Sequence, residues 1–423
     1  MNSLPSRPAP QAQSRPSGSA LAAVAMFVVL LASYSINAMD RQIFPLLAVD
    51  VRHEFGFDLA QIGLLSTIFT LGMAVAGVPT GFLLARISRR SATIVGIAIF
   101  SIGTVLTARA HGFADMLAYR AATGIGEAMQ LTVIIAIGTS YFTRLRSTAV
   151  GAVNFSFGVG AIVGPVAGSG LLAVHHAWRL PMMVFGLLGF VAIALILAAV
   201  RPWFSEARAV TRDGQARGAA VADTLWNRNT VLLTALSLIA GLIIYGYLGM
   251  YPTFLREHLG FTPAMTGRVM SAYGFGVFAS IAGGWLGDRL SARKVLAVSF
   301  VIAALLGYGL FHAATTVLAQ ALLSFVWGLV VSGVIYVNLA GYHIRSVGSQ
   351  LNNKVSGVFV SSLYGAASIA GYAIGRLATA TGWSAAGLLQ ISLLASIGAL
   401  TALALQPSRM ALPAHRAVAA AAE

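Results

Sequence analysis

The sequence has no cysteine and very little charge. Of its 423 residues, 9% are Asp, Glu, Lys or Arg and 58% are apolar. Without cysteine the chain has no disulfide, no thiolate metal ligand and no cysteine nucleophile. An ordinary soluble domain has about 25% charged and about 45–50% apolar residues. The composition therefore excludes a typical soluble enzyme, a disordered chain and a nucleic-acid-binding protein of the usual kind, and most of the chain must lie in lipid.

Sequence motifs of nucleotide-driven pumps and of common enzymes are also missing. No Gly-x-x-x-x-Gly-Lys-Ser/Thr loop occurs, which disfavours pumping by ATP on this chain. Gly158 and Gly160 lie within an apolar helical run and do not follow a strand, so they do not indicate a dinucleotide site. No Ser/His/acid set is evident, and His175-His176 lacks a spaced third ligand. We expect neither an enzyme nor a bound cofactor or metal.

Apolar runs long enough to cross a bilayer recur along the chain. One spanning helix takes about 20 apolar residues, and twelve such segments lie between Ala20 and Leu405. We therefore expect an all-α membrane protein. Its twelve transmembrane helices are predicted at residues 20–48, 60–80, 92–108, 114–142, 148–173, 181–200, 230–254, 263–286, 295–311, 316–342, 355–378 and 385–405.

Basic residues are distributed unevenly over the loops. The formal net charge is +15, and 19 of the 27 Lys and Arg residues fall on the side that holds the N-terminus. This bias follows the positive-inside rule, so both termini are predicted to face the cytoplasm, in a bacterial inner membrane, and no nucleic-acid partner is expected. The inner set includes Arg86, Arg89, Arg90, Arg144, Arg146, Arg289, Arg293, Lys294 and the five arginines from Arg201 to Arg228.

The two halves of the chain repeat each other. The loop at Gly81–Arg90 recurs 203 residues later at Gly284–Lys294, and Ala60-Gln-Ile-Gly63 echoes Ala264-Met-Thr-Gly267. Two matched six-helix bundles are typical of a secondary transporter whose site lies between them. The predicted parts are a disordered cytoplasmic tail, a six-helix bundle, a cytoplasmic linker, a second pseudo-symmetric bundle and a C-terminal cytoplasmic tail, at residues 1–19, 20–200, 201–228, 229–405 and 406–423.

Four charged residues lie deep inside apolar runs, namely Asp40, Arg41, Arg120 and Glu127. An ionised side chain at this depth costs a few kcal/mol, so such residues are usually functional. Arg120 and Glu127 are seven residues apart, on one helix face and about 10 Å apart along the axis. Adjacent Asp40 and Arg41 point about 100° apart and need partners on another helix. The economical pairing joins Asp40 with Arg120 and Arg41 with Glu127.

Three motifs, which follow one another along the chain in the expected order, resemble those of the major facilitator superfamily. Both repeated loops resemble its cytoplasmic signature Gly-x-x-x-Asp-Arg-x-Gly-Arg-Arg, Arg120–Ala128 resembles its helix 4 signature, and Gly160–Gly168 resembles a helix 5 motif of exporters. The resemblance covers residues 20–405 and implies a twelve-helix fold with alternating access. One departure is Ala85, where the superfamily has Asp.

This resemblance also implies gating residues. Because the second loop keeps Asp288, the cytoplasmic latch is expected to rest on the second half alone. Asp288 and Arg289 are predicted to bind Lys354 or the neighbouring helix end when that side is shut; the alternative is a simple turn. Gly164 and Pro165 would bend their helix and allow close approach to another; the alternative is a static kink.

Asn37-Ala-Met-Asp40-Arg41 and Arg120–Ala128 are most similar to Spinster-type lipid transporters and their bacterial relatives. In that branch matching positions are implicated in coupling. The residues support the same role, since a buried carboxyl beside an arginine that moves can take up and release a proton. Glu127 is the first choice for the proton carrier and Asp40 the second, with Arg41 and Arg120 as partners. Asp-Arg at this place also occurs in carriers of organic anions and aromatic acids. The structural alternative is a permanent ion network that only locks two helices together.

The second half is predicted to shape the substrate cavity. It has nine of the twelve tyrosines and no acidic residue inside its apolar runs. Tyrosine offers a flat apolar face and a hydroxyl, which suits a binding cavity, although helix packing or interfacial anchoring is the alternative for any one of them. The predicted cavity residues are Asn37, Asn154, Tyr245, Tyr336, Asn338 and Tyr364.

Together these features predict a proton-coupled secondary transporter that moves a small organic solute by alternating access. Two kinds of cargo remain open. One is a lysolipid, another amphipathic lipid or a drug, exported. The other is an aromatic acid, vitamin or similar organic anion, taken up with protons. A non-transporting sensor is a further alternative, which lacks support because no extra signalling domain is evident in the sequence. The expected partners are the substrate, protons and membrane lipid, and the protein is expected to be a monomer.

Overall fold

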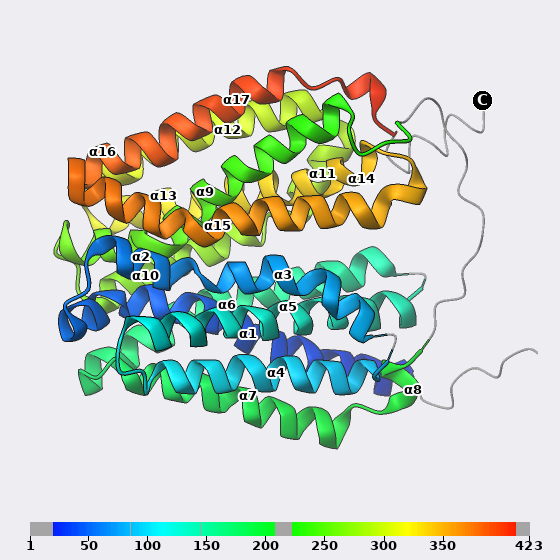
Figure 1. Ribbon diagram of the computed structural model, residues 1–423, viewed down its shortest axis with the longest axis horizontal. Helices are drawn as coiled ribbons and strands as arrows, with labels where there is room; N and C mark the ends of the chain where they lie inside the picture. Colours follow the sequence, from blue (N-terminus) through cyan, green and yellow to red (C-terminus); the bar gives the residue numbers. More distant parts are fainter. Residues whose placement is uncertain (1–19, 85, 144, 208–221, 412–423) are drawn as a thin grey trace, which may run out of the picture.

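Twelve helical spans lie side by side in the computed structural model, as Figure 1 shows. The structure describes residues 20–84, 86–143, 145–207 and 222–411. Within these ranges the predicted all-α, twelve-span membrane fold is confirmed. The predicted tail at 1–19, most of the C-terminal tail (412–423) and the middle of the linker (208–221) lie outside the described residues, as do Ala85 and Arg144.

The first six spans, called the first half below, are built from α1 (Ala20–Phe55), α2 (Leu59–Thr67) with α3 (Phe69–Leu83), α4 (Arg89–Thr107), α5 (Phe113–Tyr141), α6 (Arg146–His175) and α7 (Arg179–Ala199). The last six, called the second half, are α9 (Arg228–Glu257), α10 (Pro263–Val277) with α11 (Ser280–Arg289), α12 (Ala292–Tyr308) with η1 (Gly309–Ala313), α13 (Val317–Trp327) with η2 (Gly328–Tyr336) and α14 (Val337–Arg345), α15 (Asn352–Thr381), and α16 (Trp383–Gly387) with η4 (Leu388–Leu393) and α17 (Leu394–Leu403).

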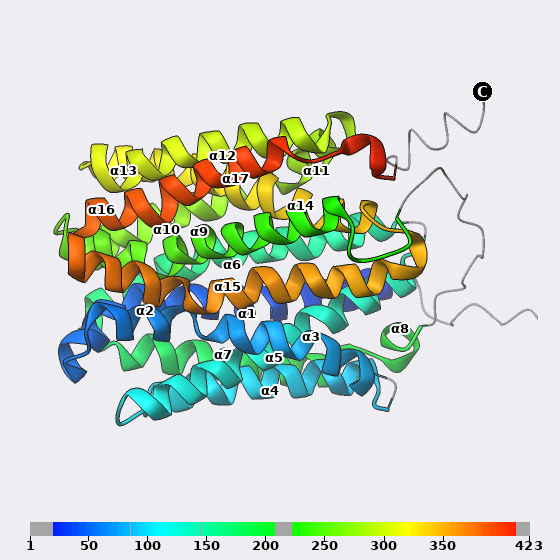
Figure 2. The ribbon, with the colours of Figure 1, turned by 45° about the horizontal axis from the view of Figure 1, so that its top comes forward.

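Both ends of the described chain lie at the same end of the bundle (Figures 1 and 2). We call this the linker end, because α8 (Pro202–Ser205) is also there. The opposite end, the far end, holds the short turns at Gly56, Gly260 and Gly382, each with a positive φ. Glycine adopts this backbone conformation without the cost that a side chain would add.

Several helix ends differ from the prediction. The first helix was expected to stop at Ala48 but continues to Phe55, because the charged residues of its last turns find partners on other helices and the turn comes only at Gly56. Spans that the sequence predicts as single helices are interrupted near Ile68 and Ala279. Three spans contain π-helical segments, which break the regular hydrogen-bond ladder and are invisible to hydropathy.

One π segment has a clear side-chain cause. Gln320 donates from Nε2 to Leu310 O at 2.9 Å and to Ala314 O at 2.7 Å, at the end of η1. Its Oε1 accepts a hydrogen bond from the Tyr251 hydroxyl. Gln320 therefore satisfies carbonyl groups that the irregular helix leaves without regular partners, inside a medium that offers no water.

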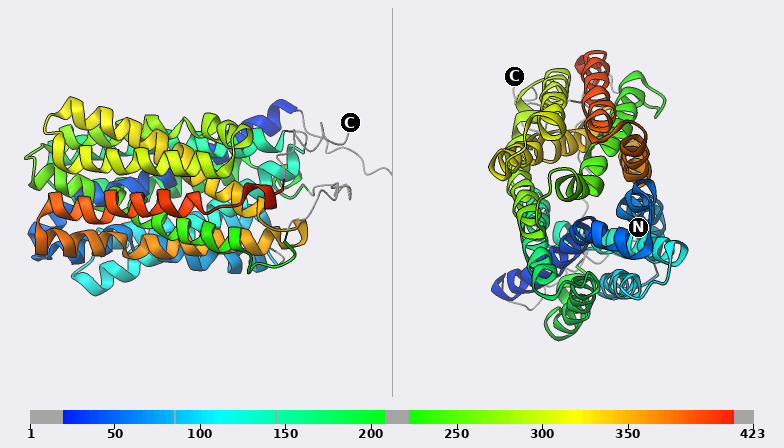
Figure 3. Two further views of the ribbon diagram at one scale, coloured as in Figure 1. Left: turned by 90° about the horizontal axis from the view of Figure 1, so that it is seen from above. Right: turned by 90° about the vertical axis from the view of Figure 1, so that its left-hand side faces the viewer.

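The two halves contact each other along two seams. The helix α6 packs on α10, and α15 packs on α2 and α3; Figure 3 shows the two groups of helices end-on. A Cβ at Gly63 would overlap the backbone of Gly371, so glycine at both positions lets the helices approach closely. The Thr67 hydroxyl donates to Ser368 O at 2.9 Å across the same seam.

The apolar core is shared at the far end and separate at the linker end. One cluster of buried residues runs from the far end of the first half through the whole second half. A second cluster contains residues of the first half alone, including Phe27, Ile134 and Phe204 near the linker end. On α6, Phe155 stacks on Phe278 of the second half but remains 56% exposed, and neighbouring Asn154 is exposed. The halves therefore share a core at the far end, and the first half has a separate core near the linker end.

The start of the linker is bound to the first half. Phe204 of α8 is buried, and Glu206 accepts hydrogen bonds from the backbone N–H groups of Arg89 at 2.9 Å and Arg90 at 3.0 Å. This carboxylate satisfies free donors at the start of α4. The other described end of the linker binds the second half, where Gly348 N donates to Ala222 O.

Candidate functional site

The four charged residues predicted inside the membrane are all buried near the centre of the chain's helical bundle. Their exposed fractions are 2% for Asp40, 7% for Arg41, 2% for Arg120 and 1% for Glu127. Asp40 and Arg41 lie in the middle of α1, and Arg120 and Glu127 lie on α5. At such burial each charge needs a specific partner.

Arg41 and Glu127 form an ion pair, with 2.9 Å between Arg41 Nε and Glu127 Oε2. This is one of the two expected pairings. The guanidinium also lies near two aromatic rings, 6.0 Å from the Tyr34 centroid and 5.8 Å from that of Phe157. Arg41 Nη2 is buried without a hydrogen-bond partner among the described residues. The arginine therefore has a donor left for an incoming acceptor.

The second expected pairing, Asp40 with Arg120, does not form as an ion pair between these residues. Arg120 Nε instead donates to Leu65 O, and its guanidinium lies 3.9 Å from the centroid of the Phe44 ring. A carbonyl and an aromatic face thus replace the carboxylate as partners. Asp40 and Arg120 still interact electrostatically over a longer distance. Neither replacement partner has a signal in the amino-acid sequence.

Asp40 has two polar neighbours that link it to the pair. The Thr104 hydroxyl on α4 donates to Asp40 Oδ1 at 2.8 Å. The Asp40 and Glu127 carboxyl groups also interact electrostatically. Two buried carboxylates that repel each other are relieved by a proton on one of them, so this arrangement is suited to hold one exchangeable proton.

A short chain of uncharged polar side chains continues from Glu127. Asn37 Nδ2 donates to Gln130 Oε1 at 2.8 Å and to Glu127 O at 3.4 Å, and Gln130 Nε2 donates to Ser33 Oγ at 3.0 Å. Asn37 was predicted as a cavity residue, whereas Gln130 and Ser33 were missed. Their sequence signal is helical spacing, since Gln130 follows Glu127 by three residues and Ser33 precedes Asn37 by four.

Three predicted tyrosines of the second half face this charged group. The hydroxyls of Tyr336 and Tyr364 lie 3.0 Å apart. Tyr245 packs edge-on against Tyr364 and against Phe69 of the first half. Arg41 interacts electrostatically with Tyr245 and Tyr364. These residues therefore meet between the halves.

The remaining two predicted cavity residues lie elsewhere. Asn338 donates from Nδ2 to Gly283 O at 2.8 Å and to Val334 O at 2.9 Å, so it joins two helices of the second half. Asn154 is exposed on α6, next to Phe155, which stacks on Phe278 of the second half. The structure brings neither of them to Arg41.

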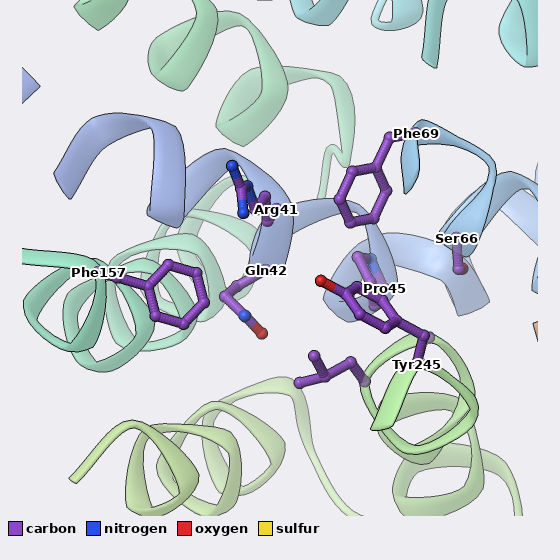
Figure 4. A pocket seen from close by; sticks show the side chains of 9 residues that line it. Arg41, Gln42, Pro45, Ser66, Phe69, Phe157 and Tyr245 are labelled. Carbon is purple, nitrogen blue, oxygen red and sulfur yellow. The ribbon is translucent and has the colours of Figure 1, made fainter. Parts of the chain in front are cut away.

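A small cavity lies beside Arg41, between the two halves (Figure 4). Its volume is about 10 Å³, which is room for about one water molecule. Any organic cargo therefore needs the side chains or the halves to move. The lining residues are Arg41, Gln42, Pro45, Ser66, Phe69, Phe157, Tyr245, Leu248 and Gly249.

The four predicted gating residues lie on two helices, Asp288 and Arg289 on α11 and Gly164 and Pro165 on α6. Asp288 is exposed and makes no ion pair with another described residue, while the Arg289 guanidinium lies 4.3 Å from the Trp285 ring. Pro165 lies inside α6, and a Cβ at Gly164 would meet the backbone of Met39 on α1. Close approach at Gly164 thus brings α6 next to the residue that precedes Asp40.

No group of three His, Asp or Glu side chains suited to a metal ion occurs within the described ranges. What the central residues can do chemically is hold a proton, exchange ion-pair partners and offer one arginine donor to an anion.

Comparison with known proteins identifies the family of this chain. A sequence model of the Major Facilitator Superfamily matches residues 26–372. The chain is 29% identical over 256 residues to protein spinster of Drosophila melanogaster, a match that covers 59% of this chain but only 42% of that protein's length. It is 25% identical to the hexuronate transporter of Bacillus subtilis, over 80% of this chain and 84% of that one. It is 26% identical to the 3-(3-hydroxy-phenyl)propionate transporter of Escherichia coli, over 70% and 73%.

Solved structures agree on the fold. The crystal structure of a bacterial homologue of the human lysosomal transporter Spinster, in an inward-facing and unoccupied conformation, superposes with a TM-score of 0.70. That alignment covers 91% of this chain and 96% of the other at 17% identity. The same homologue in an inward-facing and occupied conformation also gives a TM-score of 0.70.

Proposed function

The chain belongs to the major facilitator superfamily and is a multi-pass integral membrane protein and not an enzyme, and from this premise we propose that it is a proton-coupled secondary transporter of a small organic anion. The observation that carries the proposal is the Arg41–Glu127 ion pair with the Asp40 carboxyl beside it, buried in the first half, with Arg41 facing tyrosines of the second half. Such groups in a membrane are costly to keep and are retained for function.

The coupling step follows from the charges of these residues. With Asp40, Arg41, Arg120 and Glu127 ionised, the group sums to zero; a proton on Glu127 leaves it at +1. Arg41 would then lose its ion-pair partner and, with Nη2 already unpaired, bind the carboxylate of a cargo. Loading of proton and anion together would bias which side is open. Glu127 is the first choice for the carrier and Asp40 the second.

An organic carboxylate is the cargo class we favour. Relatives named for hexuronate, cis,cis-muconate and 3-(3-hydroxy-phenyl)propionate support it, since each of these compounds has a carboxylate. The aromatic side chains of Tyr245, Phe69 and Phe157 would pack against the cargo's carbon skeleton when the cavity widens.

An amphipathic lipid is the second candidate, supported by a different observation. An apolar groove of about 530 Å³ lies on the outer face between α1, α6 and α7, with Met39, Val174 and Leu188 among its lining residues. Met39 directly precedes Asp40 on α1, so an acyl chain in the groove would lie at the same depth in the membrane as the charged group. The similarity to protein spinster also supports this alternative.

We place the linker end in the cytoplasm, because the basic loops gather there, and the protein in a bacterial inner membrane as a monomer. The two six-helix bundles, residues 20–200 and 229–405, would then rock about the central site. On this orientation the far end, which is shut in the described conformation, faces away from the cytoplasm.

The test is a thermal-shift screen of the purified protein at pH 5.5 and pH 7.5. The panel contains cis,cis-muconate, 3-(3-hydroxyphenyl)propionate, a hexuronate, a lysophospholipid and a cationic drug. A ligand at about 100 times its Kd stabilises the protein by about 2.7 kcal/mol. We expect a shift with carboxylates that is larger at pH 5.5 than at pH 7.5. In Glu127→Gln the shift should become independent of pH, because the neutral amide frees Arg41 as the proton does. A shift whose pH dependence is unchanged in that variant would refute the role of Glu127. A shift with the lysophospholipid alone would indicate that the cargo is a lipid and not an organic anion.

A further inference from the structure

Four charged side chains join the two halves at the far end. Asp50 and Arg52 lie in the last turns of α1, and Arg256 and Glu257 end α9. Arg52 Nη1 lies 2.7 Å from Glu257 Oε1. Arg256 binds Asp50 with two nitrogens, Nη1 to Oδ2 and Nη2 to Oδ1, the latter at 3.2 Å. Each half thus contributes one arginine and one carboxylate.

The two arginines occupy equivalent positions of the internal repeat. The first half has Arg52-His-Glu-Phe-Gly-Phe57, and the second has Arg256-Glu-His-Leu-Gly-Phe261, 204 residues later. Gly56 and Gly260 adopt φ of 68° and 67°, so both helices end in the same turn. The repeat therefore places one arginine on each side of the interface, and each reaches a carboxylate on the opposite half.

These contacts lie where the halves are closed. Nearer the middle of the bundle, α2 and α15 approach closely at Gly63 and Gly371. The cavity beside Arg41 has room for only about one water. Within the described ranges, the ion pairs between the halves are these two, both at the far end. Their side chains are 13–30% exposed, so a modest movement would return them to water.

We propose that Asp50–Arg256 and Arg52–Glu257 form a reciprocal latch that holds the far end shut and that must open in every transport cycle. The proposal rests on alternating access, since a transporter that never opens the far end would need no releasable contact there. Partly exposed ion pairs of this kind each favour the closed form roughly 1.4- to 5-fold, so both together favour it roughly 2- to 25-fold. A contact of this strength favours the closed form and can still be broken in each transport cycle.

The cysteine-free chain allows a direct distance measurement. His111→Cys in the first half and His312→Cys in the second are exposed far-end positions for spin labels. In the latch-cut variant Arg52→Gln/Arg256→Gln, the distance distribution measured by double electron–electron resonance should gain a longer component, raising the open-to-closed ratio several-fold. The charge swap Asp50→Arg/Arg256→Asp should lose most of that component.

A matched control is available at the same end of the molecule. Arg179 and Glu54 form an ion pair of 2.5 Å within the first half, between α7 and α1. The variant Arg179→Gln should leave the distance distribution unchanged. If the double variant elutes as an aggregate, the single variants Arg52→Gln and Arg256→Gln replace it, each with a smaller expected shift.

An unchanged distribution in the latch-cut variants would overturn the latch, and so would a shift that the charge swap does not reverse. The labels report the distance between the halves without any cargo or pH gradient. Failure of the anion or proton assignment would therefore appear in the ligand screen and leave these distances as expected. Failure of the latch would leave the ligand screen intact.

Discussion

Neutralising either member of the buried Arg41–Glu127 pair should destabilise the protein far more than neutralising both. With Asp40 and Arg120 the group sums to zero when all four are ionised. Glu127→Gln leaves it at +1 and Arg41→Gln at −1, whereas Arg41→Gln/Glu127→Gln returns it to zero. Both side chains are almost fully buried, at 7% and 1% exposed, so water cannot compensate the remaining charge.

The magnitude follows from the cost of an uncompensated charge. Removing one partner of a buried ion pair costs about 3–5 kcal/mol, while replacing both is often close to neutral. For a large domain 1 kcal/mol corresponds to about 2 °C in Tm, so each single variant should melt roughly 6–10 °C lower. The double variant should recover most of that loss, within about 3 °C of wild type.

The two single variants should also respond differently to pH. In Arg41→Gln the excess negative charge can be removed by a proton on Asp40 or Glu127, so its loss of stability should shrink at pH 5.5. In Glu127→Gln the excess charge is on arginine, which does not release its proton in proteins. Its loss should therefore be the same at pH 5.5 and pH 7.5.

The assay is thermal unfolding of the purified proteins in one detergent at both pH values. Asp58→Asn serves as control, since Asp58 is an exposed carboxylate that caps α2 and Asn also serves as an N-cap. The reasoning is refuted if the double variant loses the sum of the two single losses, or if Arg41→Gln is equally unstable at both pH values.

Three other substitutions test the seam between the halves, the hydrogen bond to Asp40 and a π segment. Gly371→Ala should overlap the backbone of α2 and lower the free energy of unfolding by roughly 1–3 kcal/mol, whereas Gly365→Ala on the same helix meets nothing within 4 Å and should be neutral or stabilising in thermal unfolding. Thr104→Val removes the hydrogen bond to Asp40 and should shift the pH profile of proton-driven transport, while Thr104→Ser should retain the wild-type profile; identical profiles for both would contradict this positioning role. Gln320→Leu leaves two carbonyls of the π segment unpaired and should cost about 2 kcal/mol or more in thermal unfolding, with an unchanged Tm as the contrary result.

Hydropathy and loop charge predicted the number of spans because both follow directly from the cost of placing polar groups in lipid. The Arg41–Glu127 contact was also predictable, since adjacent charges on one helix need partners on another. Asp40 and Arg120 show the limit of that reasoning. The carbonyl of Leu65 and the ring of Phe44 satisfy Arg120, and these are partners that any sequence offers in abundance.

Details that depend on packing were not predictable. Tyr245, Tyr336 and Asn338 have similar sequence contexts, yet the tyrosines face Arg41 and Asn338 binds two carbonyls within its own half. The far-end arginines Arg52 and Arg256 look like ordinary loop charges until the two helix ends are seen together. Rotation of a helix and pairing of distant loops are set by the whole bundle and leave no local signal.

The separate core near the linker end bears on how the protein is made. A chain emerges from the ribosome N-terminal part first, so the first six spans are present in the membrane before the last six. The cluster around Phe27, Ile134 and Phe204 needs no residue of the second half and can form at this stage. The far-end part of the same spans buries its apolar residues only in the cluster shared with the second half. Before the second half is inserted, the first half thus has a packed core near its linker end. Lipid covers the apolar residues of its far end until α9, α10 and α15 pack against them.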